Sequence, residues 1–210
     1  MRWSRVGPAL AVVAALAVSG GLALTDDDGT PQPTPASEAA PVPITSDAPR
    51  FERLEQLVAA SDLVVRGTVV AVEPGRVFGD PGQAAVRSRL VTLTIDEVVA
   101  GSGATGSSLV VEEPGWLDDG TPIEVDGVPA SAVGTTVLWF LQSVPPLTSD
   151  AGSGPATYVV TGPQGHYVVE GDRLLGAGGD EAEPLARRLE DLGLDGLRAA
   201  IRGLVAPTSP

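Results

Sequence analysis

The stretch that decides the fold reads Leu63-Val64-Val65-Arg66-Gly67-Thr68-Val69-Val70-Ala71-Val72. Most of its residues are apolar and many are β-branched, a composition that favours a β-strand. A glycine inside a strand weakens it unless the strand bends or forms a bulge there, and Gly67 lies in the middle of this one. Such a bend is what a strand needs to turn the corner of a barrel. The stretch therefore predicts a barrel strand over residues 63–72.

Further strands are predicted downstream of this one. The most apolar run after the N-terminal segment, Val137–Leu141, is expected to be the central buried strand. The turn sequence Gly162-Pro163-Gln164-Gly165 separates two short strand-like stretches, which are expected to pair as a hairpin. In chain order the predicted strands are 87–99, 109–113, a short hairpin arm within 121–128, 137–141, 158–161 and 166–170.

Helical patterns flank the strands. Apolar residues recur at helical spacing over residues 50–60, which predicts a short helix. Near the C-terminus, Pro184 suits the first turn of a helical piece, and Asp195 can cap a second piece after Gly193. Sequential strands in a domain of about 160 residues favour a closed barrel, because closure removes exposed strand edges. Periodicity alone leaves a barrel and a sandwich both open.

Several of these strands resemble those of a known group of domains. Residues 61–69 followed by 91–101 resemble the opening strands of OB-fold-like domains in exported bacterial proteins, and residues 134–141 and 161–171 resemble later strands. The resemblance covers residues 51–205 and extends distantly to the netrin-like barrels of tissue inhibitors of metalloproteinases. It implies a mainly β fold, an OB-like antiparallel barrel of five to seven strands with a short N-terminal helix and C-terminal helices. Those inhibitors chelate zinc through an N-terminal cysteine, which this chain lacks, so the resemblance implies a fold and no inhibitory activity.

The N-terminal residues predict export. Arg2 and Arg5 precede an apolar run that extends from Val6 to Leu24 and has small residues near its end. Residues 1–24 therefore have the pattern of an export signal, and the positive charge places the chain beyond Leu24 outside the cytoplasm. The run is long enough for either a cleaved signal peptide or a retained single-pass anchor, and both interpretations stay open.

The remaining chain divides by composition. Prolines among small and polar residues predict a disordered linker over residues 25–49. The barrel domain is expected over residues 50–205, with a disordered tail over residues 206–210.

Composition excludes several classes of function. The net charge is −14 at pH 7, all 13 basic residues are arginine, and cysteine is absent. Such an acidic chain repels nucleic acid and anionic headgroups, so we expect no nucleic-acid partner and membrane contact only through the N-terminal segment. The absence of cysteine and lysine excludes a thiol nucleophile, a Schiff base and a P-loop lysine. The arginine-only composition is typical of a GC-rich bacterial genome.

Three residues are candidates for contact with a ligand: Trp116, Gln164 and His166. His166 is the only histidine. As a general base it would need a serine and an acid nearby. The chain has no Gly-x-Ser-x-Gly elbow to present such a serine. The simpler interpretation of His166 is a partly solvated strand residue just after a turn. Trp116 is either core cover or an exposed platform for a ligand. Gln164 is expected at a hairpin tip, where turn chemistry alone also explains its neighbours.

Acidic pairs and clusters offer other chemistry. Asp118-Asp119-Gly120 and residues 180–183 lack the ligand spacing of a calcium loop, so we interpret them as solvated loops. Glu112 and Glu113 are adjacent in a predicted strand and should point to opposite faces, which excludes a glycosidase acid/base pair. No catalytic residue, metal ligand or cofactor is predicted.

These observations favour a non-enzymatic extracytoplasmic module that binds a cell-envelope protein or glycan through loops at one end of the barrel. A secreted hydrolase that uses His166 or loop carboxylates is the first alternative. A calcium-stabilised surface protein is the second.

Overall fold

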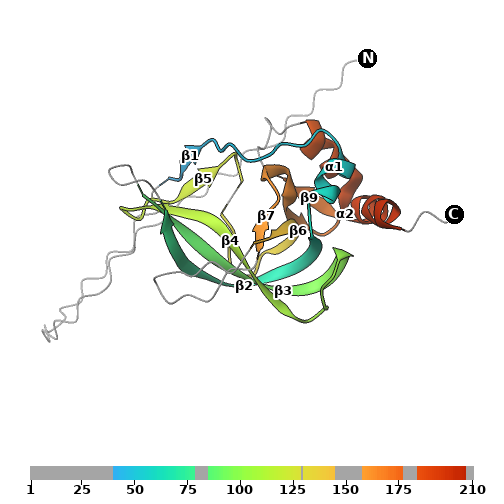
Figure 1. Ribbon diagram of the computed structural model, residues 1–210, viewed down its shortest axis with the longest axis horizontal. Coiled ribbons are helices and arrows are strands. Elements are labelled where there is room, and N and C mark those ends of the chain that lie inside the picture. The colour runs from blue at the N-terminus through green and yellow to red at the C-terminus, as the bar shows by residue number, and fades with distance from the viewer. Residues whose placement is uncertain (1–39, 79–84, 129, 145–157, 177–183, 207–210) are drawn as a thin grey trace, which may run out of the picture. The chain divides into compact units, whose positions relative to one another are not determined.

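The computed structural model describes residues 40–78, 85–128, 130–144, 158–176 and 184–206, all within one compact unit, Glu38–Pro210. It is mainly β, with a short helix after the first strand and a helical segment after the last (Figure 1). In chain order the elements are β1 (Val42–Ile44), α1 (Leu54–Ala59), β2 (Leu63–Phe78), β3 (Val86–Gly101), β4 (Ser108–Leu117), β5 (Ile123–Val125), β6 (Thr136–Ser143), β7 (Tyr158–Val160), the 3₁₀ helix η1 (Pro163–Gly165), β8 (His166–Glu170), β9 (Arg173–Leu175) and α2 (Pro184–Val205).

Five strands close into a barrel, as predicted. The sheet runs β2-β3-β4-β7-β6-β8-β9, and a further pairing between β2 and β6 closes its first five strands on themselves. Strands β8 and β9 extend the sheet beyond the closure. The predicted barrel is wholly antiparallel, and in this respect it is wrong, because β4 and β7 pair in parallel. The parallel pair arises because β6 crosses to the far side of β2 before the chain returns beside β4.

Strand β2 closes the barrel because it bends. Its pairing with β3 shifts register at four places, one of them between Arg66 and Gly67. A side chain at Gly67 would lie 2.4 Å from the carbonyl oxygen of Thr94 and 2.8 Å from Leu93 Cγ, so only glycine lets the two strands approach this closely. The bulges let one long strand pair with β3 along its length and with β6 over its first half. The bend predicted at Gly67 is confirmed.

Strand β6 divides the apolar core into two parts. Residues 137–141 of this strand are all fully buried, as predicted. Their side chains alternate, so one face fills the barrel and the other packs under the helices. The barrel interior contains Leu63, Val65, Val69, Val91, Leu93, Ile95, Leu109, Val111, Val137, Trp139 and Leu141. The outer core contains Leu57, Val64, Val99, Leu138, Phe140, Tyr167, Leu174, Leu185, Leu189, Leu194, Leu197 and Ile201.

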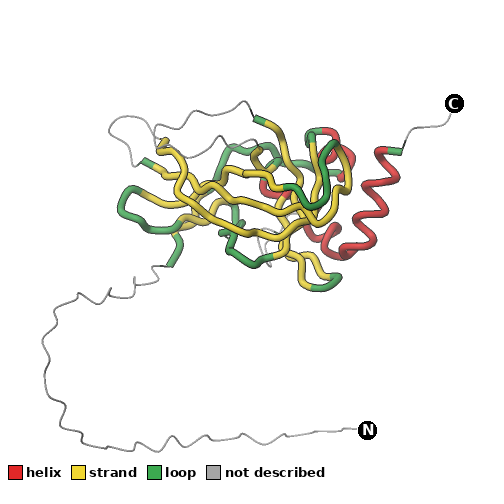
Figure 2. The backbone as a smooth tube through the Cα atoms, turned by 90° about the horizontal axis from the view of Figure 1, so that it is seen from below, coloured by secondary structure: helices red, strands yellow, loops and turns green. Residues whose placement is uncertain are grey.

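The helical segments lie together on one flank of the barrel (Figure 2). Helix α2 begins at Pro184 as predicted, and it breaks at Gly193, whose φ of 65° and ψ of 178° are not helical. The predicted two helical pieces are thus one segment with a break. Beyond the break, the backbone carbonyl of Asp172 accepts a 2.9 Å hydrogen bond from the N–H of Leu194, and its carboxylate accepts a 3.1 Å hydrogen bond from the N–H of Asp195. Asp172 therefore has the capping role that the sequence assigned to Asp195.

One expectation about pairing is wrong, and a second is met only in part. Strands β7 and β8 do not form a hairpin; both pair with β6, and the turn sequence between them is the buried helix η1. Strand β2 occupies the other edge of β6, so β7 and β8 follow each other along one edge, and the glycine and proline form the excursion between them. The short hairpin arm predicted within residues 121–128 is confirmed in part, since antiparallel bridges join Val125 to Val128 and Trp116 to Pro122. Its strand β5 also pairs in parallel with β1. Strand β1 comes from the end of the predicted disordered linker, so residues 42–44 are ordered against the domain.

The predicted export segment, residues 1–24, and most of the linker lie outside the described residues. Among the residues that are described, no helix is both long and apolar enough to span a membrane.

Candidate binding site at the end of the barrel

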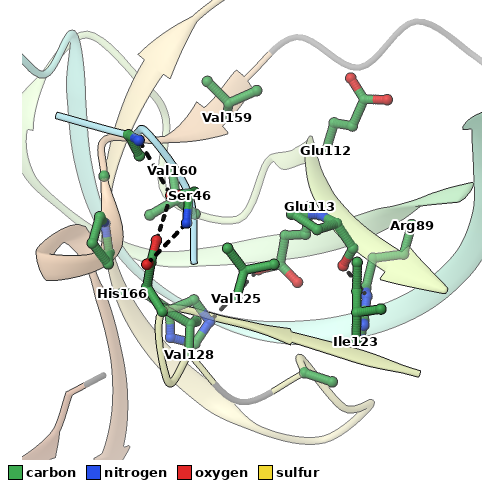
Figure 3. A pocket seen from close by; sticks show the side chains of 16 residues that line it. Ser46, Arg89, Glu112, Glu113, Ile123, Val125, Val128, Val159, Val160 and His166 are labelled. Carbon is green, nitrogen blue, oxygen red and sulfur yellow. Dashed lines mark hydrogen bonds and ion pairs between the residues drawn. The ribbon is translucent and has the colours of Figure 1, made fainter. Parts of the chain in front are cut away.

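A cavity of about 270 Å³ opens at one end of the barrel. Its walls come from β4, β5 and β7, from the turn before β8, and from the segment between β1 and α1 (Figure 3). Most of the lining is aliphatic: Ala48, Pro114, Ile123, Val125, Val128, Ala130, Val159, Val160 and Pro163. A concave, mostly apolar cavity with a few convergent polar groups has the composition of a ligand site.

A layer of polar residues forms the floor of this cavity. Val91 on β3 and Val111 on β4 lie opposite each other in the barrel core. Two positions further along each strand, Arg89 and Glu113 form the next pair on the same face. Because side chains alternate along a strand, Arg89 and Glu113 point to the same face as these valines. His166 is paired with the core residue Trp139 in the same way. We call Arg89, Glu113, Ser131 and His166 the polar layer.

The members of the polar layer are held by hydrogen bonds and by the opposite charges of Arg89 and Glu113. Arg89 is only 4% exposed and donates from Nε to Pro114 O at 2.9 Å and from Nη2 to Gly115 O at 3.1 Å. Burial lowers the pKa of Arg89, while the nearby negative charge of Glu113 opposes that shift. Ser131 Oγ donates to Glu113 Oε1 at 2.9 Å. The Arg89 guanidinium carbon also lies 5.1 Å from the centre of the Trp116 ring, a cation–π contact.

The geometry around His166 differs from that of a catalytic relay. Its Nε2 lies 3.4 Å from Ser131 Oγ and 3.6 Å from Glu113 Oε1. A Ser-His-acid relay places the serine on one ring nitrogen and the acid on the other. Here both partners lie at Nε2, Ser131 already donates to Glu113, and Nδ1 has no hydrogen-bond partner among the described residues. The arrangement therefore holds a buried histidine without activating the serine.

Residues 42–50, which we call the N-terminal strap, border the same cavity. Strand β1 pairs with β5, and Ser46 and Ala48 contribute to the lining. The Asp126 carboxylate holds this segment in place through three hydrogen bonds. It accepts the backbone N–H of Ser46 at 3.1 Å, the hydroxyl of the same serine, and Arg50 Nη2 at 2.9 Å. Burial opposes ionisation of Asp126, but the bonds from Ser46 and the charge of Arg50 outweigh it, so the pKa of the carboxyl is lowered. Asp126 is also the one described residue other than glycine with positive φ, at 53°.

The structure places the three candidate residues differently. His166 lines the cavity, but it is 2% exposed, so the expectation of a partly solvated side chain is wrong. Gln164 is also 2% exposed and lies in η1, where it exchanges two 3.1 Å hydrogen bonds with the backbone N–H and C=O of Phe51. It is therefore not at an exposed hairpin tip, and it attaches the chain before α1 to the barrel. Trp116 is half-buried at the end of β4 and lines a second depression with Pro74 and Arg87.

The acidic residues are used in separate contacts. Glu112 and Glu113 both border the cavity, but Glu112 is bound by Arg76 Nε at 2.9 Å, whereas Glu113 faces Ser131 and His166. In the loop after β4, Asp119 accepts the N–H of Thr121, and this contact lowers the pKa of its carboxyl. Within the described residues, no group of three or more His, Cys, Asp or Glu is placed to hold a metal ion. Residues 180–183 lie outside them.

The sequence did not identify Arg89, Ser131, Ser46 or Asp126. Arg89 and Glu113 are an opposite-charge pair that continues the apolar face of two strands, but this signal can be read only when the register between β3 and β4 is known. Asp126-Gly127 is a turn signal, and it explains the positive φ without indicating the contact with Ser46.

Comparisons with known proteins do not add to this description. No protein-family model matches the chain, and no curated protein matches it.

Proposed function

We propose that this protein is an extracytoplasmic, non-enzymatic binding module that captures a cell-envelope protein in the cavity at the end of its barrel. The observation that carries the proposal is the preformed cavity itself, which has aliphatic walls and a polar floor. Ligand sites in proteins commonly combine such walls with a small number of fixed polar groups. The export pattern of residues 1–24 supports a location outside the cytoplasm, where cell-envelope proteins are available as partners.

A protein partner fits this cavity better than a glycan. Among the described residues the lining includes valine, isoleucine, alanine and proline, and no Trp, Tyr or Phe. A sugar needs hydroxyl partners and commonly an aromatic face, whereas an apolar side chain of a protein gains free energy by leaving water for such walls. A buried apolar anchor in a pocket is also the usual centre of a protein–protein interface.

The barrel order supports the proposal of an OB-like fold. The closed strands form a five-stranded Greek-key barrel, because β2, β3 and β4 follow one another and β6 returns to the far edge of β2. OB-like barrels are Greek-key barrels of five strands, and they bind ligands through one face and its adjoining loops. A fold shared by many functions does not itself identify a partner, so the cavity carries the functional argument.

The hydrolase alternative has less support. It depends on His166, whose Nε2 faces both Ser131 and Glu113 and whose ring is buried against Trp139, with ring centres 5.3 Å apart. A general base must reach a serine that is free to be deprotonated, and Ser131 donates to a carboxylate instead.

Site-specific photocrosslinking tests the proposed function. The photoreactive residue p-benzoylphenylalanine replaces Ala130 at the exposed rim of the cavity, or Val205 at the end of α2 as the matched control, in the full-length chain in producing cells. We expect a crosslink to one envelope protein from position 130 and none from position 205. A crosslinked saccharide, or no difference between the two positions, would overturn the proposal of a protein partner in the cavity.

Fractionation of the same cells tests the location. We expect the chain in the membrane or secreted fraction, and mass spectrometry of its N-terminus then distinguishes a retained anchor from a cleaved signal. Recovery from the cytosol would contradict an extracytoplasmic function.

A further inference from the structure

We infer that the group which enters the barrel-end cavity is uncharged and apolar. This inference rests on the proposed function and identifies the chemistry of the captured group. It follows from two properties of the cavity: the charges on its walls are already matched, and the remaining surface is aliphatic.

In the described part of the chain, each acidic side chain that lines the cavity lies near an arginine of the same domain. Glu113 lies opposite Arg89 in the β3–β4 pairing, and its charge acts on the arginine. Glu112 is bound by Arg76 at 2.9 Å. Asp126 is bound by Arg50, also at 2.9 Å.

This pairing makes a charged ligand unfavourable. A charge that enters a partly buried site loses hydration, and the loss is compensated only if the site provides an opposite charge or several hydrogen bonds. In this cavity a new cation would have to compete with Arg76 for Glu112 or with Arg50 for Asp126. At Glu113 it would meet a carboxylate that already accepts a hydrogen bond from Ser131 and lies opposite Arg89 in the sheet. A new anion would meet the negative charges of Glu112, Glu113 and Asp126 around the same cavity. Carbonyl oxygens already bind two of the five N–H donors of Arg89, the charged group of opposite sign in this lining.

An apolar group has no such cost. The aliphatic walls gain from contact with it, at roughly 25 cal/mol for each Å² of apolar surface removed from water. The volume is sufficient, since an apolar cavity of about 150 Å³ can hold benzene and this one measures about 270 Å³. The group therefore has the size and chemistry of a large aliphatic or aromatic side chain.

A pair of fluorescent probes tests the inference. N-phenylnaphthylamine is neutral, and its sulfonate, anilinonaphthalene sulfonate, has the same ring system with a negative charge. We expect saturable binding of the neutral probe to the purified domain, with the charged probe at least about ten-fold weaker. Equal or tighter binding of the sulfonate would overturn the inference.

Cavity-filling variants locate the probe. Val125→Trp and Val128→Trp each place an indole in the cavity, whereas Val205→Trp adds the same side chain at an exposed position on α2. Thermal unfolding measured by circular dichroism identifies which variants fold. We expect binding of the neutral probe to weaken about ten-fold or more in a folded cavity variant and to be unchanged in Val205→Trp. Unchanged binding in folded cavity variants would contradict the inference.

If neither cavity variant folds, nuclear Overhauser effects between the neutral probe and the valine methyl groups of the wild-type domain decide the question. Contacts with Val125 or Val128 support the inference, and contacts confined to other residues overturn it.

The proposed function and the inference about the apolar group can fail separately. Loss of probe binding with a retained crosslink rejects the apolar group alone, whereas probe binding without an envelope crosslink rejects the proposed function alone.

Discussion

Replacing Asp126 should release the N-terminal strap while the barrel stays folded. The Asp126 carboxylate is 4% exposed and accepts three hydrogen bonds, two from Ser46 and one from Arg50. Hydrogen bonds to a charged group contribute about 1.5–3 kcal/mol each when buried. The bond from Arg50 counts for less, since the Arg50 side chain is 40% exposed.

Three substitutions at this position separate the contributions. Asp126→Asn tolerates the positive φ of 53° and keeps one acceptor oxygen, so we expect it to destabilise the closed strap by about 1–2 kcal/mol. Asp126→Gly also tolerates this φ and removes all three bonds, for a loss of about 3–6 kcal/mol, most of it from the two bonds with Ser46. Asp126→Ala adds about 1 kcal/mol of backbone strain to that loss.

Amide hydrogen exchange measures the opening residue by residue. Val42 donates to Pro122 O at 2.9 Å within the strap contact, whereas Val69 donates to Thr135 O at 2.9 Å within the barrel. For Asp126→Asn we expect exchange at Val42 to be roughly 5–30 times faster, with Val69 unchanged. Unchanged exchange at Val42 would refute the assignment of Asp126 as the fastener. Equal acceleration at both amides would show that the strap and the barrel open together.

The same contact predicts a pH dependence with a definite sign. The folded-state pKa of Asp126 is lowered, so its contribution is fully present above the ordinary aspartate pKa and is lost as pH falls through the lowered value. Exchange at Val42 relative to Val69 should thus be constant from neutral pH down to about pH 4 and rise only below it. In Asp126→Asn this acid-induced change should disappear.

Three other substitutions test separate parts of the fold, each by urea denaturation. Tyr167→Phe should stabilise the domain by about 1 kcal/mol, because the buried hydroxyl has no hydrogen-bond partner among the described residues; a loss of stability would contradict this. Gly67→Ala should destabilise it by about 3 kcal/mol, since the added Cβ would lie 2.4 Å from Thr94 O; a neutral effect would show that β2 and β3 can separate freely. Glu97→Gln should cost about 1 kcal/mol, because Glu97 binds Arg198 and Arg202 of α2, each at 2.6 Å; no change would mean that α2 is held by apolar packing alone.

The barrel could be predicted because its signals are local. The β-branched run at 63–72, the glycine within it and the apolar run at 137–141 each report on the strand in which they occur. Burial on both faces of β6 follows from its apolar composition, and the bulge at Gly67 follows from the absence of a side chain.

Pairing between short strands could not be predicted in this way. The sequence between β7 and β8 has the residues of a turn, and such a sequence is compatible both with a hairpin and with an excursion between two strands that follow each other along one edge of β6. The outcome depends on barrel closure, which requires β7 to lie beside β4. Closure is a property of the whole sheet, and no single stretch encodes it.

The cavity depends on contacts between segments far apart in the chain. Ser46 meets Asp126 across 80 positions, and Ser131 meets His166 across 35. Of the three residues that the sequence identified for ligand contact, only His166 lines this cavity. Its neighbours Arg89 and Glu113 are charged residues within strands, and their position over the core is defined only by the register of β3 and β4.

The most direct test of the cavity is a methyl NMR titration of the domain with neutral N-phenylnaphthylamine. The binding site proposed here predicts that the largest shifts and the probe contacts fall on Val125, Val128, Val159 and Val160. Shifts concentrated instead on the exposed leucines of α2, Leu192 and Leu204, would contradict it.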